Sequence, residues 1–286
     1  MKEPIRAKTR KEKITFREIA EADEFRCTRK MLPIVVGKRV DDRPTVIDLA
    51  QVGHLLCVGM TGSGKPVFLH SLIASVLLCF SPKKLKLILI DIRGIEFDSY
   101  RQIPHLQVPI IQDSTRAVLT LKWVLGEIDR RVSGRRLLCE KLTRLIVCID
   151  EYADLILADK KRFENLVATI CEKGARVGVH LVLSTHCAST DVVTRSIKKS
   201  LPSRVCFRVA SASNSKAVLG RLGGERLSAA GDLLLLREGS DNIFRVHGSL
   251  VGEKDTQTIT KLWKAESRYC KTSCSGLGQF RVDFSY

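Results

Sequence analysis

The chain has 286 residues, 44% of them apolar, so it is long enough to bury a sizeable core as one large domain or two small ones. Its 48 Lys and Arg against 31 Asp and Glu give a formal net charge of +17, which favours a polyanionic partner, nucleic acid ahead of an anionic membrane surface. No apolar run reaches 18 residues, and the ten cysteines include no CxxC pair, which argues against a membrane span, a zinc site and a disulfide scaffold and predicts reduced thiols in the cytoplasm.

The chain divides into two peripheral ends and a patterned middle. Residues 1–28 are charge-dense, begin with MKEPIRAKTRKEK and lack the apolar stretch of a secretory signal, so we expect a basic N-terminal tail. Residues 267–286 show neither helical nor alternating periodicity and predict a C-terminal tail, which leaves one domain over 29–266. In that domain the predicted strands are 54–59, 85–91, 145–150, 180–185, 204–209, 232–237 and 243–248, and the predicted helices are 65–79, 115–132, 160–174, 190–199, 213–221 and 253–266.

This alternation of strands and helices predicts an α/β fold with a mostly parallel sheet flanked by helices on both faces. Several strands are almost continuously apolar, as expected for strands that are buried on both faces. The last two strands are joined by the short, turn-rich stretch EGSDN, so we expect them to form an antiparallel hairpin at one edge of the sheet.

A glycine-rich turn separates the first predicted strand from the first predicted helix. In HLLCVGMTGSGKPVFLH (54–70), Gly59, Gly64 and Lys65 match the phosphate-loop pattern Gly-x4-Gly-Lys. The backbone N–H groups of such a turn form a nest for phosphate oxygens, the following helix adds a favourable dipole, and the lysine reaches the β- and γ-phosphates. A purely structural turn is the alternative. The predicted nucleotide-binding residues are Gly59, Met60, Thr61, Gly62, Ser63, Gly64, Lys65 and Pro66.

Polar residues at two other strand ends complete the candidate site. Asp150 and Glu151 follow the apolar run in LIVCIDEYADLI, where Asp150 is placed to organise Mg²⁺ and Glu151 to act as the general base on a water molecule. The alternative is an acidic strand end with no catalytic role. HLVLSTH ends in Thr185 and His186, polar residues that gain meaning only beside the first two elements. We therefore predict Asp150, Glu151 and His186 as catalytic residues.

The order of these motifs resembles the motor domain of the FtsK/SpoIIIE family of DNA translocases. The resemblance spans roughly residues 33–263 and rests on HLLCVGMTGSGK, LKLILIDIRGIEFDSYRQIPHL, LIVCIDEYADLI, GVHLVLSTHCASTDVVTRSIKKSLPSRVCFRV and FRVHGSLV. It implies a RecA-like P-loop core, ATP and Mg²⁺ as cofactors, and a hexameric ring that moves double-stranded DNA by ATP hydrolysis. Asp91, Arg93 and Glu96 fall on the family's Asp-Pro-Lys…Glu segment.

The chain departs from the family pattern at its phosphate loop. Pro66 replaces the Ser or Thr whose hydroxyl holds magnesium, and it also removes a backbone N–H, although proline suits the first turn of a helix. Loss of one such donor costs on the order of 100- to 1000-fold in rate. His186 and Cys187 stand where the family has Gln-Arg. The Arg of a different family segment, Ala-Arg-Ala-Ala-Gly, appears here one place later, as Arg176. ATPase activity is therefore left open.

Three functions remain possible at this point: a DNA-translocating ATPase, a hydrolysis-impaired nucleotide- and DNA-binding component of a homo-oligomeric or mixed ring, and a secretion- or conjugation-type pump subunit. The biological process, whether chromosome partition and cell division, sporulation or plasmid transfer, is open as well. Residues 190–226 hold eight Lys and Arg against two acids, and there we predict phosphate contacts from Arg195, Lys198, Lys199 and Arg204. A second basic cluster comprises Arg130, Arg131, Arg135, Arg136, Lys141 and Arg144. For any single lysine, a solvated helix face is the alternative.

Overall fold

The computed structural model describes residues 13–134, 142–227, 230–240 and 242–269. The strands are β1 (Pro33–Arg39), β2 (Pro44–Asp48), β3 (Leu55–Val58), β4 (Leu85–Asp91), β5 (Arg144–Asp150), β6 (Val179–Thr185), β7 (Ser203–Phe207), β8 (Asp232–Leu236) and β9 (Ile243–Gly248). The helices are α1 (Phe16–Ala20), α2 (Asp23–Arg26), α3 (Leu49–Val52), α4 (Lys65–Cys79), α5 (Ser114–Ser133), α6 (Tyr152–Lys173), α7 (Arg195–Ser200), α8 (Ala212–Leu219) and α9 (Glu253–Tyr269). None of these helices is long and apolar enough to cross a membrane.

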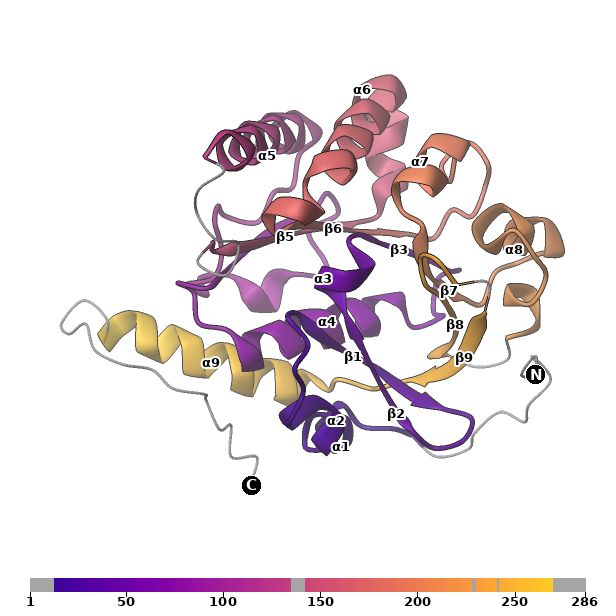
Figure 1. Cartoon of the computed structure of the whole chain (residues 1–286), viewed down its shortest axis with the longest axis horizontal. Coiled ribbons are helices and arrows are strands. Elements are labelled where there is room, and N and C mark those ends of the chain that lie inside the picture. Colours follow the sequence, from indigo (N-terminus) through magenta and orange to yellow (C-terminus); the bar gives the residue numbers. More distant parts are fainter. Residues whose placement is uncertain (1–12, 135–141, 228–229, 241, 270–286) are drawn as a thin grey trace.

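All nine strands form one mixed sheet in the order β2-β1-β9-β8-β7-β3-β6-β5-β4 (Figure 1). The five strands from β7 to β4 are parallel, whereas β8, β9, β1 and β2 are joined by antiparallel pairings. The predicted α/β fold is confirmed, but the description as mostly parallel holds only for the half of the sheet that carries the phosphate loop.

The antiparallel edge of the sheet differs from the prediction. β8 and β9 do pair antiparallel, but β1 pairs with the outer side of β9, so β1 and β2 form the edge hairpin. Gly37 allows this approach, because a Cβ there would lie 1.9 Å from the carbonyl oxygen of His247. The sequence analysis missed β1 and β2, both of which begin at a proline, a residue that is typical of a break in a strand pattern.

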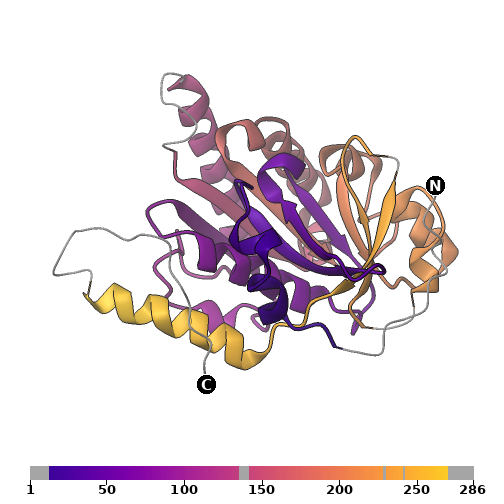
Figure 2. The same cartoon turned by 60° about the horizontal axis from the view of Figure 1, so that its bottom comes forward.

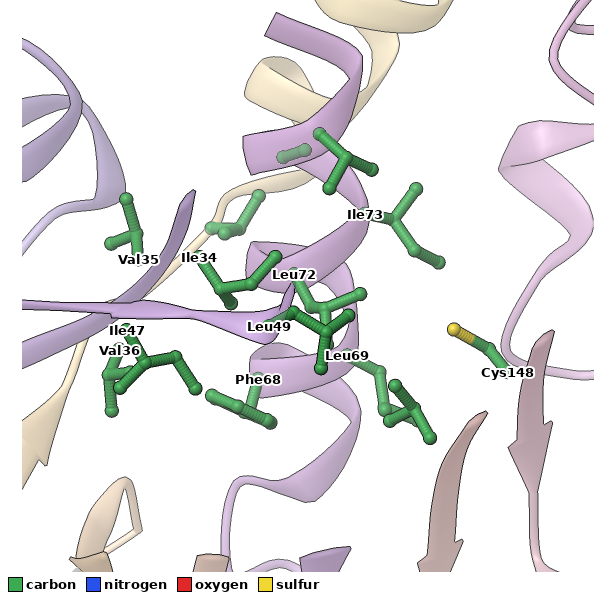
Figure 3. Packing of buried hydrophobic residues seen from close by; sticks show 14 of the residues in the cluster. Ile34, Val35, Val36, Ile47, Leu49, Phe68, Leu69, Leu72, Ile73 and Cys148 are labelled. Carbon is green, nitrogen blue, oxygen red and sulfur yellow. The ribbon is translucent and has the colours of Figure 1, made fainter. Parts of the chain in front are cut away.

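Alternate residues of the parallel strands pack into two helical layers. Leu55 and Cys57 of β3 join the cluster formed with α4, β1 and α9, whereas Leu56 and Val58 join the cluster formed with α5, α6 and α7. Figures 1 and 2 show α5 to α7 on one side of the sheet and α4 and α9 on the other. Within the first layer, Phe68 and Leu72 of α4 pack with residues of the β1–β2 hairpin (Figure 3). The strands are thus buried on both faces, as their apolar runs predicted.

The described part of the N-terminal segment is packed on the domain and does not form a free tail. Phe16 and Ile19 of α1 and Phe25 of α2 are buried, and the Phe16 N–H donates to the Leu250 carbonyl at 2.9 Å. The expectation of a tail over 1–28 is therefore corrected for residues 13–28, because a few well-spaced apolar residues among the charges suffice to anchor them. Residues 1–12, and 270–286 of the predicted C-terminal tail, lie outside the described residues.

Candidate nucleotide site

The glycine-rich turn 59–64 joins the end of β3 to the start of α4. Gly62 and Gly64 have φ of +74° and +108°, in the region that favours glycine. At Gly59 a Cβ would lie 2.5 Å from the Cβ of Phe207, so no larger residue fits without a shift. The glycines are required by the backbone path of the turn, as expected for a loop whose N–H groups surround a phosphate.

Lys65 is the first residue of α4 and only 6% exposed. Its ammonium donates to the carbonyl oxygens of Gly59 and Met60, which keeps it at the mouth of the turn. Burial lowers the pKa of this ammonium, and the carboxylates of Glu151 and Asp150 counteract that effect. A buried cation that faces two carboxylates across the turn is the arrangement that a bound triphosphate with a metal ion needs.

Pro66 occupies the first turn of α4, where backbone N–H groups have no intrahelical acceptor. The helix continues unbroken from Lys65 to Cys79, so the prediction that the fold tolerates this proline is confirmed. The side chain supplies no hydroxyl for a metal ion. The structural consequence is nil and the chemical consequence is a missing ligand.

Glu151 links the acidic strand end to the end of β6. Its side chain is buried, and one carboxylate oxygen accepts a hydrogen bond from the Thr185 hydroxyl at 2.8 Å. The other oxygen accepts from the His186 backbone N–H at 3.2 Å and from the His186 ring nitrogen Nδ1. Glu151 has φ +52° and ψ +67°, a left-handed conformation that is costly for a residue with a side chain. The structure therefore brings Glu151, Thr185 and His186 together, as the sequence predicted.

Asp150 stands at the end of β5 beside this cluster. Burial raises the pKa of its carboxyl to about 6, and the charges of Glu96, Glu151 and Asp91 contribute in the same direction. A nearby cation would stabilise the ionised form of this carboxylate. Among the described residues no group of three or more His, Cys, Asp or Glu is arranged to hold a metal by itself. Magnesium nevertheless fits, because it is commonly bound by one or two carboxylates together with substrate phosphates and water.

The segment after β4 lies near the site, since the charges of Asp91 and Glu96 act on Asp150. Asp91 is buried and accepts three backbone N–H groups of the following turn, the shortest from Glu96 at 2.8 Å. Glu96 lies 3.8 Å from Nε2 of His70 on α4. Arg93 donates to both carboxylate oxygens of Asp154 on α6, at 2.8 and 3.2 Å. Asp91 is therefore a turn-forming residue, and Arg93 ties the turn to α6.

The four predicted DNA contacts fall into two groups. Arg195 and Lys199 of α7 are exposed and Lys198 is half-buried. Arg204, at the start of β7, instead donates to three backbone carbonyls, those of Lys198, Leu201 and Val218, at 2.6, 3.1 and 3.1 Å, and burial lowers the pKa of its guanidinium. Arg204 thus fastens α7 and α8 to the sheet, and its guanidinium is occupied by these carbonyls.

The second basic cluster is only partly described, since Arg135, Arg136 and Lys141 lie outside the described residues. Arg131 donates to Glu127 at 2.6 Å and to the Val177 carbonyl at 2.9 Å. Hydrogen bonds from Arg130, the largest cause, and from Arg131 lower the pKa of the Glu127 carboxyl to about 2. Arg131 has a local structural role.

One neighbour of the phosphate loop carried no signal in the sequence. The Gly231 N–H, just before β8, donates to the Ser63 carbonyl at 2.8 Å. The contact is between two backbones, so no side-chain pattern could have indicated it.

Comparisons with known proteins indicate the family of the chain. The model of the FtsK/SpoIIIE family matches residues 15–138. The chain is 32% identical over 294 residues to a DNA translocase FtsK of Haemophilus influenzae, covering 89% of this chain and 56% of that protein. It is 35% identical over 264 residues to the DNA translocase FtsK of Treponema pallidum, covering 86% of this chain and 33% of that protein. The chain thus spans about half or less of these curated relatives.

Solved structures show the same fold. The conjugation coupling protein TcpA of pCW3, in a monomer form with ATPγS, superposes with a TM-score of 0.74 at 24% identity, over 90% of this chain and 75% of that one. The cytoplasmic domain of the Thermomonospora curvata type VII secretion ATPase EccC gives a TM-score of 0.67 at 23% identity, over 81% of this chain and 31% of that one. At these identities the likeness concerns the fold alone.

Proposed function

The chain belongs to the FtsK/SpoIIIE family of DNA translocases, and from this premise we propose that it binds ATP with Mg²⁺ and acts as a motor subunit on double-stranded DNA. One observation carries the proposal. Three elements meet at the carboxyl ends of the parallel strands: the phosphate turn with Lys65, the acidic strand end at Asp150 and Glu151, and Thr185 with His186. There Glu151 contacts both Thr185 and His186.

Each group has a definite role in this site. The backbone N–H groups of the turn bind phosphate oxygens, and Lys65 exchanges its carbonyl partners for the β- and γ-phosphates. Asp150 would hold a magnesium ion, which when bound would supply positive charge to the phosphates. Glu151 accepts the proton of the attacking water, and Thr185 and His186 orient its carboxylate. In this arrangement His186 is a positioning residue, since its ring contacts the base.

Pro66 limits the chemistry and leaves binding intact. The missing hydroxyl removes one magnesium ligand, and loss of one such group typically slows a reaction on the order of 100- to 1000-fold. We therefore propose a subunit that binds ATP and DNA, hydrolyses ATP slowly by itself, and assembles into a ring of identical or related subunits in the cytoplasm. The hexamer that the family resemblance implies is the assembly to test first.

The DNA surface is proposed on α7. Arg195, Lys198 and Lys199 present charge that is independent of base sequence, which suits a motor that moves along any DNA. A pump for protein substrates is the alternative, because the chain shares its fold with conjugation and secretion ATPases, but no contact among the described residues favours it. A steep fall of duplex affinity with salt supports DNA, and a flat dependence supports the pump.

The deciding experiment compares ATP turnover of the native chain and Pro66→Ser, each with and without duplex DNA. We expect DNA to stimulate turnover in both proteins and the serine variant to be at least about 10-fold faster. Equal rates in the two proteins contradict the role given to Pro66. Absence of DNA stimulation in both, in protein shown to be folded and oligomeric, contradicts the motor function.

A further inference from the structure

The segment before β8 lies against the phosphate turn. Gly231 donates its N–H to the Ser63 carbonyl at 2.8 Å, and a Cβ at Gly64 would lie only 2.8 Å from the Gly231 nitrogen. Gly64 itself has φ +108°. The two backbones are therefore in direct contact at the residue that precedes Lys65, so the position of residue 231 limits the path of the turn.

Gly231 is held on its other side by β9. The Gly248 N–H donates to the Gly231 carbonyl at 2.7 Å, and a Cβ at Gly248 would lie 2.9 Å from that carbonyl oxygen. A continuous chain of backbone hydrogen bonds thus runs from Ser63 through Gly231 to the end of β9. The glycines at these crossings leave no side chain between the β8–β9 hairpin and the phosphate turn, so the two are joined backbone to backbone.

A buried ion pair fixes the hairpin at this point. The carboxylate of Asp232, the residue after Gly231, is 0% exposed and receives two hydrogen bonds from the Arg245 guanidinium, at 3.0 and 2.7 Å. Nδ1 of His247 lies 3.8 Å from the same carboxylate. An ion pair in a sheet interior is a poor source of stability, because desolvation offsets the attraction, but its planar two-point geometry fixes the relative position of two strands.

We propose that the Asp232–Arg245 pair is a positioning element of the nucleotide site. It holds Gly231 against Ser63 and thereby keeps the N–H groups of the turn in the arrangement that phosphate requires. The inference rests on the proposed function, since it needs ATP to bind at this turn. The competing role, closure of the β8–β9 hairpin alone, predicts an effect on stability and none on the affinity of the folded protein.

The test measures the Mg-ATP affinity of Asp232→Asn and Arg245→Lys, each beside its thermal unfolding curve. Glu127→Gln is the matched control, because it removes one charge of the Glu127–Arg131 pair, whose side chains are 14% and 7% exposed and which lies on α5 beside Val177, just before the start of β6. We expect both hairpin variants to bind ATP at least about 10-fold more weakly at temperatures where they are folded, as small misplacements of a binding group do. The control keeps the native affinity whatever its melting temperature.

Arg245→Lys also separates position from charge, because lysine keeps the charge but loses the two-point geometry. Folded hairpin variants with native ATP affinity overturn the proposal. If both variants fail to fold, the paired variant Asp232→Leu with Arg245→Met replaces the ion pair by apolar side chains, a change that such sites often tolerate, and the same two outcomes apply to it.

Hydrogen exchange of the native chain tests the same proposal without a substitution. ATP is expected to slow exchange at the Gly231 amide together with the amides of residues 59–64. Protection confined to 59–64 overturns the proposal while leaving ATP binding intact. A native chain that binds no ATP at all removes the proposed function first, so the two failures are distinguishable.

Discussion

Buried ionisable groups lie at both ends of the parallel strands, but their surroundings differ between the two ends. At the end where β3, β5 and β6 finish, Lys65, Asp150 and Glu151 are crowded together, and Glu151 has a left-handed backbone. At the end where β3 and β6 begin, His54 and His180 are buried with ordinary hydrogen bonds. The first cluster lowers the stability of the fold and has the charged groups to bind a charged ligand. The second cluster keeps its histidine rings neutral and has a structural role.

His54 and His180 have hydrogen-bond partners within the fold. Nε2 of His54 donates to the Cys171 carbonyl at 3.1 Å, and Nδ1 accepts the Leu181 N–H at 3.0 Å. Nδ1 of His180 donates to the Gly53 carbonyl at 2.8 Å. Burial, with a smaller contribution from His180, lowers the pKa of His54 to about 4, so the ring is neutral at physiological pH. The contrast between the two ends leads to four predictions.

The largest effect is expected for Asp150→Asn. Measured in the Pro66→Ser chain, ATP turnover should fall on the order of 100- to 1000-fold, because the magnesium ligand is lost. The melting temperature should nevertheless rise, since burial raises the pKa of the Asp150 carboxyl to about 6 and ionised aspartate is therefore disfavoured at pH 7. The expected gain, discounted for partial exposure, is about 1 kcal/mol. A lower melting temperature would contradict the idea that the ionised Asp150 carboxylate destabilises the fold.

The pH dependence of unfolding should reveal the buried histidines. Burial lowers the pKa of both His54 and His105 from 6.5 to about 4, so between those values the unfolded chain binds more protons and stability falls as the solution is acidified. Each contributes about 3 kcal/mol across that window. Asp150 acts in the opposite direction, because its native carboxyl is protonated below about 6.

We therefore expect a net loss of stability between pH 6.5 and 4 and a steeper loss in Asp150→Asn, measured by urea unfolding at a series of pH values. Stability that stays constant or rises toward pH 4 would show that the histidines are not held neutral.

His54→Phe should lower the stability of the fold without changing its affinity for ATP. The substitution leaves the Cys171 carbonyl and the Leu181 N–H buried without their partners, which costs about 2–4 kcal/mol of unfolding free energy. The ATP affinity of the folded variant should stay within about 2-fold of the native value, because small effects are expected away from the site. A large loss of affinity would mean that the strand starts are coupled to the phosphate turn.

The smallest effect concerns DNA. Lys199→Gln on α7 should weaken duplex binding uniformly across sequences and reduce the slope of log K against log salt by about 0.9, the value for one phosphate contact. Lys83→Gln, an exposed lysine after α4, is the matched control and should leave the slope unchanged. Equal slopes for both variants would place the DNA contacts elsewhere.

Prediction from sequence worked where a single long signal dominates. The α4 helix was predicted at 65–79 and β4 at 85–91, and both have those bounds. A glycine turn marks the start of α4, and an almost continuous apolar run marks β4. β1 and α1 were missed, since β1 begins at Pro33 and the apolar residues of α1 stand among charged ones. In α6 the prediction began at 160, and the backbone of Asp159 is indeed non-helical, with φ −161° and ψ +87°, so the predicted segment is the part of α6 that follows this kink. The helical turns from Tyr152 to Ala158 were missed.

For the site, sequence order identified which residues share a strand end but not how they contact one another. Glu151, Thr185 and His186 were expected near one another, yet the hydrogen bonds that occupy both Glu151 oxygens depend on a backbone conformation that no spacing rule indicates. Arg204 was predicted to bind DNA because it is basic, and its position at the start of β7 instead aims it at backbone carbonyls.

Calorimetric titration of Mg-ATP into the native chain and into Lys65→Ala tests the central claim most directly. If the turn, the acidic strand end and the β6 end grip a triphosphate, the native chain should bind one ATP per subunit with a dissociation constant below about 1 mM, in the range of working nucleotide sites. Lys65→Ala should lose at least about 100-fold in affinity while keeping its fold. No saturation of the native chain at millimolar ATP, or equal affinity in the two proteins, would contradict the account.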